Sequence, residues 1–265
     1  MSSHSASLAV TGLSVRYPQR NVLAVSDITF SVAPGEFVAI VGPSGCGKST
    51  LLKAIAGLLP FSQGSVTFSS GLGTRIGFVF QTDALLPWSS ASGNIELAFR
   101  LGGAPPAEAR TRAQALLSHV GLADASSLFP GQLSGGMRKR VALARALAYD
   151  PAIFLMDESF SALDAQTRIQ VGNFFLGLLR QSGQTVVFVT HDIEEAVTLA
   201  DRVLVMSRSP GHLETEISIH LPKPRDYHAS RFAPGFNELQ QRVWNALNFP
   251  LAPTHEAVQP QELET

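Results

Sequence analysis

The sequence predicts an α/β fold in which a buried parallel sheet follows a small antiparallel β layer and is interrupted by a helical insertion. Three observations indicate this arrangement. Short continuous apolar runs recur along the chain, as is typical of parallel strands buried on both faces. A glycine-rich loop joins the first of these runs to a helix with apolar periodicity, and from about residue 87 to 150 the pattern is helical and rich in alanine. We therefore expect one α/β domain over residues 8–221, followed by a C-terminal tail over residues 222–265.

The elements of this domain follow from residue periodicity. Residues 8–30 alternate apolar and polar side chains between turn signals, which predicts antiparallel strands, and residues 64–68 predict another. The strands expected in the parallel sheet are residues 37–41, 76–80, 153–156 and 186–189. The clearest helices are expected from about Ser49 and over residues 107–119 and 137–148.

The last part of the chain has its own pattern. Asp192 and Glu195 predict a capping box for a helix that runs toward Ala200. After Leu221 we expect a loop and then one amphipathic helix, whose apolar face carries Phe236, Leu239, Val243 and Leu247. The end of the chain from Pro250 is predicted to be mobile.

Composition narrows the classes of function. The 265 residues are 45% hydrophobic and 15% charged, which is typical of a soluble globular protein. With 20 Lys and Arg against 21 Asp and Glu and no basic run, we expect no nucleic-acid partner. No apolar run approaches the ~20 residues that span a bilayer, and the N-terminus lacks the pattern of a signal peptide. The single cysteine, Cys46, allows no intramolecular disulfide, so we expect the chain in the cytosol.

A phosphate-binding loop lies between strand 37–41 and the following helix. Its residues, with the helical residue next to it, are Gly42, Pro43, Ser44, Gly45, Cys46, Gly47, Lys48, Ser49 and Thr50. The glycines let backbone N–H groups converge on phosphate oxygens, Lys48 adds a positive charge, and the helix N-terminus favours an anion. The alternative, a glycine turn with an incidental lysine, is disfavoured by the strand and helix on either side.

The cysteine of this loop is a candidate reactive thiol. Cys46 lies near Lys48 and a helix N-terminus, and both features predict a lowered thiol pKa. The alternative is a buried and inert thiol.

Polar residues that follow two buried strands are candidates for catalysis. Asp157 would hold Mg²⁺ directly or through water, with the Ser49 hydroxyl as another ligand. Glu158 would orient and deprotonate an attacking water, because phosphoryl transfer needs positioning and charge stabilisation. His191 follows the next strand at the same sheet edge and would touch a γ-phosphate, although a histidine at a helix start more often caps or packs. The alternative for the two acids, an exposed pair after a strand, is disfavoured by the apolar run before them.

The helical insertion contains a second candidate anion site. Ser134, Gly135 and Gly136 precede the helix that continues from Met137, so a hydroxyl, free N–H groups and the helix dipole point at whatever docks there. An ordinary glycine loop before a helix is the alternative.

These motifs, in this order, resemble those of the ATP-binding subunits of ABC transporters over nearly all of residues 8–221. The matches are the Walker A loop at residues 42–49, the Q-loop glutamine Gln81, the signature at residues 133–137, the end of Walker B at residues 156–158, the D-loop at residues 161–164 and the switch histidine His191. The resemblance implies a P-loop NTPase (RecA-like) core with an N-terminal antiparallel β subdomain and an inserted α-helical subdomain. It also implies an ATP hydrolase coupled to transmembrane transport, a translocase.

The resemblance assigns roles to individual residues. The catalytic residues would be Lys48, Gln81, Glu158 and His191, and the metal ligands Ser49, Gln81 and Asp157, with ATP and Mg²⁺ as cofactors. Tyr17 would stack on adenine, although its position equally suits a half-buried strand residue. The signature residues Ser134, Gly135, Gly136 and Met137 would bind the ATP held by a second copy of the chain, and Asp164 would lie at the dimer interface. Two copies related by a two-fold axis would then enclose two ATP molecules.

A finer resemblance points to the nitrate, sulfonate and taurine importers, a group that includes relatives importing pyrimidine vitamin precursors. It is carried by the signature start, by residues 85–88 and by residues 221–226. It implies membrane-spanning permease subunits as partners, indirectly a solute-binding protein, and a peripheral location at the cytoplasmic face of the inner membrane. We expect residues 81–88 to receive the membrane partner, with Trp88 as an anchor and Leu85 packing internally.

Two residues depart from the family pattern. Met137 replaces the usual Gln of the signature, and Ser159 replaces the Pro that usually follows the Walker B glutamate. We expect neither substitution to prevent hydrolysis.

Two other functions remain as alternatives. A non-transport ABC ATPase would usually contain a coiled-coil insertion, a second ATP-binding unit or a basic character. A small-molecule kinase would have no use for the signature.

Overall fold

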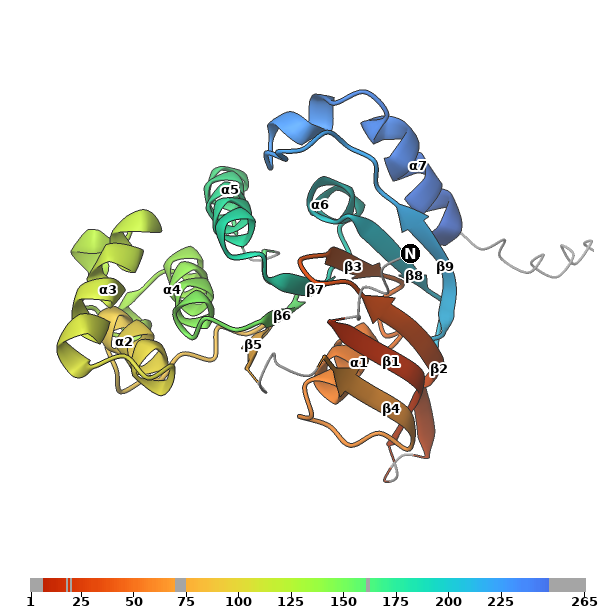
Figure 1. Cartoon of the computed structure of the whole chain (residues 1–265), viewed down its shortest axis with the longest axis horizontal. Helices are drawn as coiled ribbons and strands as arrows, with labels where there is room; N and C mark the ends of the chain where they lie inside the picture. The colour runs from red at the N-terminus through yellow and green to blue at the C-terminus, as the bar shows by residue number, and fades with distance from the viewer. Residues whose placement is uncertain (1–6, 18, 20, 70–74, 161–162, 248–265) are drawn as a thin grey trace, which may run out of the picture.

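The computed structural model describes residues 7–17, 19, 21–69, 75–160 and 163–247, and it contains two sheets with a group of helices set to one side (Figure 1). The predicted mobile end from Pro250 lies outside the described residues. Within the described part, no helix has both the length and the apolar character required to cross a membrane.

The smaller sheet is the antiparallel layer that the alternating pattern predicts. Its strands are β1 (Leu8–Tyr17), β2 (Val22–Val32) and β4 (Gln63–Phe68), in the order β2-β1-β4. Leu8 of the central strand lies opposite Val32 on one side and Phe68 on the other. The predicted strands within residues 8–30 and at residues 64–68 are thus confirmed.

The larger sheet has the order β5-β6-β7-β3-β8-β9. Its strands are β3 (Phe37–Val41), β5 (Ile76–Val79), β6 (Ile153–Asp157), β7 (Thr185–Val189), β8 (Arg202–Met206) and β9 (Leu213–Ser218). Every residue of β3, β6 and β7 is buried, as the continuous apolar runs predict. These strands are parallel, so their carboxyl ends bring three loops to one edge of the sheet.

The helices form two groups. On the insertion lie α2 (Ala91–Leu101), α3 (Pro106–His119) and α4 (Gly135–Ala148); elsewhere lie α1 (Lys48–Ile55), α5 (Ala165–Ser182), α6 (Ile193–Leu199) and α7 (Phe236–Leu247). The insertion helices have a core of their own beside β5 (Figure 1). Helix α1 packs in a core shared by the two sheets, whereas α5, α6 and α7 share a core on the other face of the parallel sheet.

The predicted capping box at the start of α6 is only half right. The Asp192 carboxylate accepts hydrogen bonds from the backbone N–H groups of Glu194 and Glu195. The reciprocal bond from the Asp192 N–H to Glu195 is absent, because this N–H donates to Thr190 Oγ1 at 3.0 Å. Glu195 turns inward instead and accepts hydrogen bonds from the hydroxyls of Thr190 and Tyr227.

Candidate functional site

An open cavity of about 1060 Å³ lies at the carboxyl edge of the parallel strands, where the two sheets meet. The predicted site residues that line it are Tyr17, Ser44, Gly45, Gly47, Lys48, Ser49, Thr50, Gln81, Glu158 and His191. Residues far apart in the sequence meet here because each lies at the end of a strand or in the segment that follows it. A cavity of this kind, with a few converging polar groups, suits a small charged ligand.

The phosphate-binding loop connects the end of β3 to α1. The Lys48 side chain folds back over it, and its ammonium donates to the carbonyl oxygens of Gly42 at 2.7 Å and Pro43 at 2.9 Å. Gly47 has φ 99°, and a Cβ there would lie 2.7 Å from the carbonyl oxygen of Ala24. Only glycine fits this position, which lets the loop approach the antiparallel sheet and turn into the helix.

The prediction of a lowered Cys46 pKa is wrong. The side chain is buried beneath the loop, and burial raises the pKa of the thiol despite the nearby Lys48 ammonium. The cost of desolvating a thiolate thus outweighs the attraction of one lysine, whose Nζ lies 3.9 Å from Sγ. Gly42, Pro43 and Cys46 shape the loop from behind the surface that faces the cavity.

Ser49 lines the cavity and contacts Asp157, which is buried next to it. The Ser49 hydroxyl donates to Asp157 Oδ1 at 2.8 Å, and Asp157 ends β6. Burial raises the pKa of Asp157, while the hydrogen bond from Ser49 opposes the rise. Two hard oxygen donors beside a phosphate loop suit Mg²⁺, which takes few protein ligands when it also binds phosphate. Among the described residues, no group of three or more His, Cys, Asp and Glu is placed to hold a metal ion by itself.

Two predicted residues converge on the carboxylate of a third, Glu158. Gln81 Nε2 donates to Glu158 Oε2 at 2.9 Å, and His191 Nδ1 lies 3.2 Å from Glu158 Oε1. Glu158 has φ 44°, an uncommon conformation for this residue type, and its N–H donates to the carbonyl of Val189 at 2.9 Å. This turn aims the carboxylate into the cavity between the ends of β6 and β7. The carboxylate is therefore held from both sides, in an orientation suited to accept a proton.

Tyr17 satisfies both of the interpretations that its position allows. It ends β1 and is half-buried, as expected of a strand residue, and its hydroxyl lies 3.1 Å from Thr50 Oγ1. It also lines the cavity, together with residues of the phosphate loop and α1. Stacking of its ring on a base stays a prediction.

The signature residues lie at the start of α4, outside this cavity. Ser134 is the N-cap, and its hydroxyl accepts from the Met137 N–H at 3.2 Å. Ser134 and Gly135 are exposed, whereas Met137 packs partly on the core of the insertion. The free N–H groups of the first turn therefore face solvent rather than the phosphate loop of the same chain.

The D-loop prediction falls partly outside the described residues, which exclude Ser161 and Ala162. Asp164 is exposed and caps α5 by accepting from the Thr167 N–H at 3.0 Å. Hydrogen bonds from Thr167 lower the pKa of Asp164, so this residue stays charged. The other departure from the family pattern, Ser159, is fully buried behind Glu158.

Sequence reasoning missed a buried lysine that supports the site. Lys139 on α4 is completely buried, and its ammonium donates to the carbonyl oxygens of Phe80 at 2.8 Å and Gln81 at 2.9 Å. Burial lowers the pKa of Lys139, and nearby acidic groups oppose this. Lys139 lies four positions before the buried Leu143, so helical periodicity would place it on the inward face. It joins the signature helix to the backbone of Gln81.

The segment after Gln81 contains both partly buried and exposed apolar side chains. Leu85 packs partly on the core of the insertion, as expected. The Trp88 ring is 75% exposed, and no packing within the described residues accounts for such a large apolar side chain at the surface. Trp88 therefore remains available for an external contact.

Comparison with known proteins gives consistent similarities. The family described as ABC transporter matches residues 25–161. An aliphatic sulfonates import ATP-binding protein of Xanthomonas axonopodis pv. citri (strain 306) is 44% identical over 88% of this chain and 93% of the relative. A taurine import ATP-binding protein of Yersinia pestis bv. Antiqua (strain Antiqua) is 43% identical over 80% of this chain and 84% of the relative. The solved dimeric structure of the ATP-binding cassette MJ0796 in a post-hydrolysis state, bound to ADP and Pi, is 33% identical with a TM-score of 0.72, over 80% of this chain and 99% of that one.

Proposed function

Because this chain belongs to the ABC transporter family, we propose that it is the ATP-hydrolysing subunit that powers import of a small solute through membrane-spanning partners. The observation that carries the proposal is the arrangement around Glu158. Gln81 and His191 hold its carboxylate at the edge of a cavity whose floor is the phosphate-binding loop. A kinase would need a second substrate in place of the water that Glu158 is aimed to activate.

The residues of the cavity divide the work of hydrolysis. The loop N–H groups and the Lys48 ammonium bind the phosphates, and Tyr17 offers an aromatic face to the base. Mg²⁺, held by Ser49, Gln81 and Asp157, would neutralise charge that develops on the phosphate oxygens. Glu158 orients the attacking water and accepts its proton at a carboxylate oxygen. His191 and Gln81 keep the carboxylate in place, and His191 also reaches toward the terminal phosphate.

The exposed signature supports a dimer that encloses ATP. Ser134, Gly135, Gly136 and Met137 would bind the phosphate held by a second copy, with Asp164 near the two-fold axis. The solved relative, whose dimer is described as bound to ADP and Pi, supports such an arrangement. Hydrolysis would then require two chains at each ATP.

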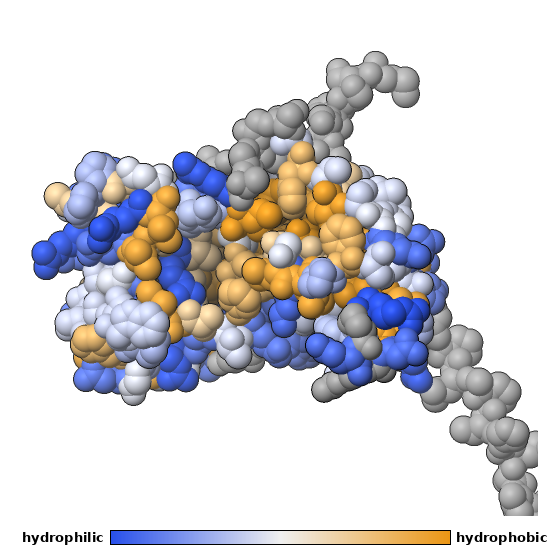
Figure 2. Space-filling view, turned by 90° about the horizontal axis from the view of Figure 1, so that it is seen from below, coloured by the Kyte–Doolittle hydropathy of each residue, from blue (hydrophilic) through white to orange (hydrophobic). Residues whose placement is uncertain are grey.

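The apolar surface supports a membrane-spanning partner. Figure 2 shows an extended apolar area on one face of the molecule. Among the large exposed apolar side chains of the described residues, six lie on the insertion or just after α1, namely Leu58, Phe61, Trp88, Leu97, Leu101 and Phe129, and the other three are Val22, Phe232 and Trp244. Such a surface suits docking of a permease at the cytoplasmic face of the membrane, with a solute-binding protein acting indirectly through it.

The names of the relatives favour an organic sulfonate or taurine as cargo. Nitrate and, as the alternative, a pyrimidine vitamin precursor follow only from the resemblance of the sequence motifs. The test is growth of a strain lacking this subunit on each compound as the sole source of sulfur, nitrogen or the vitamin precursor. Wild-type chain should restore growth on a sulfonate, and a Glu158→Gln chain should not. Restoration by both would contradict a role for hydrolysis, and restoration on the vitamin precursor alone would support the alternative cargo.

A further inference from the structure

The segment after β9 contacts both ends of the short helix α6, which begins two residues after His191. The guanidinium of Arg225 donates to the carbonyl of Leu199 at 3.0 Å and to that of Ala200, at the end of the helix. The Tyr227 hydroxyl donates to Glu195 Oε1 at 3.2 Å, in the first turn. Arg231 forms an ion pair with Glu194. The C-terminal segment therefore holds α6 at both ends.

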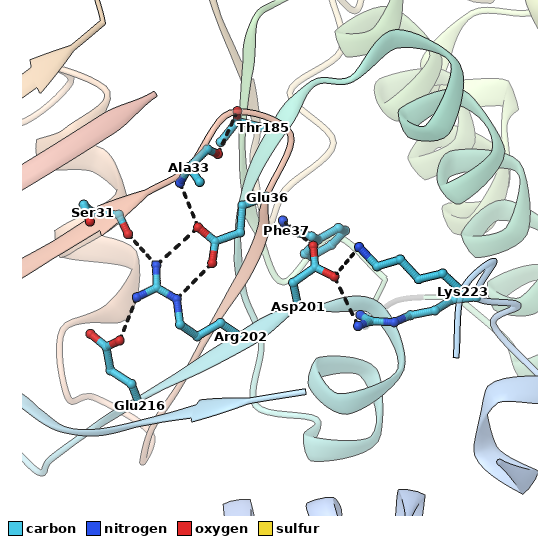
Figure 3. Close-up of polar contacts among 10 residues, drawn as sticks. Ser31, Ala33, Glu36, Phe37, Thr185, Asp201, Arg202, Glu216 and Lys223 are labelled. Atoms are coloured by element: carbon cyan, nitrogen blue, oxygen red, sulfur yellow. Dashed lines mark hydrogen bonds and ion pairs between the residues drawn. The ribbon is translucent and has the colours of Figure 1, made fainter. Parts of the chain in front are cut away.

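This segment is itself firmly anchored. Asp201, which precedes β8, accepts from Lys223 at 2.8 Å and pairs with Arg225 at 3.1 Å, and it also accepts from the N–H of Phe37 (Figure 3). Beside these contacts, Arg202 bridges Glu36 and Glu216 (Figure 3). The start of the C-terminal segment is thus tied to the amino ends of β3 and β8, opposite the edge that carries the cavity.

The Tyr227 ring is closely packed in the core. It is completely buried, and a Cβ on Gly172 of α5 would lie 2.2 Å from its ring, so α5 offers glycine where the ring rests. The Asn173 side chain accepts from the Tyr227 N–H and donates to Asp226. Burial raises the pKa of the Tyr227 phenol, so the hydroxyl stays protonated and acts as a donor. The ring and its hydroxyl have one defined position.

Glu195 connects Tyr227 by hydrogen bonds to Thr190, the residue before His191, and through Thr190 to Asp192, the residue after it. Its second carboxylate oxygen accepts from Thr190 Oγ1 at 2.8 Å, and the same hydroxyl accepts from the Asp192 N–H at 3.0 Å. Arg168 of α5 lies 3.8 Å from Glu195 and donates to the carbonyl of Leu163 at 3.0 Å. Tyr227, Glu195 and Thr190 form a hydrogen-bonded chain that ends at the backbone beside His191, with a branch to the residue before Asp164.

His191 depends on this support because its side chain is not held by packing. The side chain is 62% exposed, and its ring Nδ1 lies 3.2 Å from Glu158 Oε1. An exposed side chain is not fixed by packing, so its place follows from its backbone. The backbone is fixed by Thr190 before it and Asp192 after it.

We propose that Tyr227 is a positioning residue for ATP hydrolysis, which acts through Glu195 and Thr190 to hold His191 at Glu158. The inference rests on the proposed function, because it gives His191 a part in hydrolysis. It assigns the C-terminal segment a role in the site although none of its described residues, up to residue 247, lines the cavity. ATP binding, which depends on the phosphate loop, does not pass through this chain of contacts.

The test is Tyr227→Phe, which keeps the ring and removes the donor. We expect kcat for ATP to fall about tenfold, as for loss of one hydrogen bond to a charged group, with KM and nucleotide affinity unchanged. Thr190→Val removes the other hydroxyl on Glu195 and should lower kcat in the same way. Tyr149→Phe, at the end of α4 and outside this chain of contacts, is the matched control and should keep wild-type kcat.

The decisive readout is the double-mutant cycle with His191→Ala, measured in single turnovers with enzyme in excess. If Tyr227 acts through His191, Tyr227→Phe should lower the rate no further in the His191→Ala background. Rate losses that multiply would overturn the inference, as would a wild-type kcat for Tyr227→Phe. A wild-type chain that does not hydrolyse ATP would overturn the proposed function, and the inference with it.

Discussion

Two helix N-termini in this molecule are suited to phosphate, and they differ in how complete they are. Helix α1 starts in a cavity where Lys48 and the hydrogen-bonded pair of Ser49 and Asp157 surround the phosphate loop. Helix α4 starts at an exposed turn where Ser134 caps one N–H and Gly135 faces solvent. The first region, at the start of α1, forms a cavity within one chain, whereas the second region, at the start of α4, is a set of donors outside that cavity.

The difference shows which half of the site one chain can use alone. The dipole and N–H groups of α4 are worth little in water, because solvent competes for them, and much more once a partner covers them. ATP binding should therefore depend on the first region alone, and hydrolysis on both. Variants that change only one of the two regions should therefore separate binding from hydrolysis.

The largest effect is expected from Lys48→Ala, which removes the charge from the first region. ATP binding should be abolished while the fold remains, because the lost group is a charge-assisted donor to phosphate and not part of the apolar core. Nucleotide titration and circular dichroism check this. Lys223→Ala, an exposed lysine at the opposite edge of the sheet, is the control. Wild-type affinity in a folded Lys48→Ala chain would show that the loop is not the site.

Glu158→Gln should separate binding from hydrolysis. The amide keeps the shape and hydrogen-bonding ability of the side chain but cannot accept a proton, so turnover should fall by about 10²-fold or more while ATP still binds. The closed dimer should then persist, and gel filtration with Mg-ATP would reveal it. A monomeric variant that still turns over ATP would contradict both the role of Glu158 and the shared site.

Ser134→Arg changes the second region alone. Bulk and charge at the start of α4 should block the place where the partner's phosphate must sit, so dimer formation and hydrolysis should be lost. The affinity of the single chain for ATP should stay within about twofold of wild type, since Ser134 lies outside the cavity. A loss of ATP binding by the monomer would show that the two regions are not separate.

The smallest effect on the isolated chain is expected from Trp88→Ala. The ring is exposed, so its removal should change the free energy of unfolding by no more than about 0.5 kcal/mol and leave ATPase activity nearly intact. Assembly with the membrane subunits, measured by co-purification, should weaken. Normal assembly and transport by the Trp88→Ala variant would show that Trp88 does not contribute to the contact with the membrane partner.

Much of the first region could be predicted from the sequence, because local patterns determine it. The apolar run of β3 predicts a buried strand, and parallel pairing then brings Glu158 and His191 to the edge that carries the loop. Strand β9 was missed because it lies at a sheet edge, where most of its residues are polar and only two are apolar. Tyr227 lies in a segment without periodicity, so its burial on Gly172 depends on tertiary packing that no local pattern shows.

Two errors concern burial of ionisable groups. The neighbours of Cys46 in sequence are those that lower a thiol pKa, but the loop folds over the thiol and burial raises it. Lys139 was missed although helical periodicity places it on the inward face, because the carbonyl groups that accept its donors belong to the distant segment at Gln81. Both outcomes depend on what a distant segment places around the group.

The claim that each ATP is hydrolysed between two chains is tested most directly by mixing the Lys48→Ala and Ser134→Arg chains. Each alone should be inactive, one for lack of the first region and one for lack of the second. At one of its two sites, a mixed dimer pairs the intact phosphate loop of one chain with the intact signature of the other, so mixing should restore ATPase activity, to at most about half of that of the wild-type dimer. A mixture as inactive as its components would contradict the shared site, as would a Ser134→Arg chain that is fully active by itself.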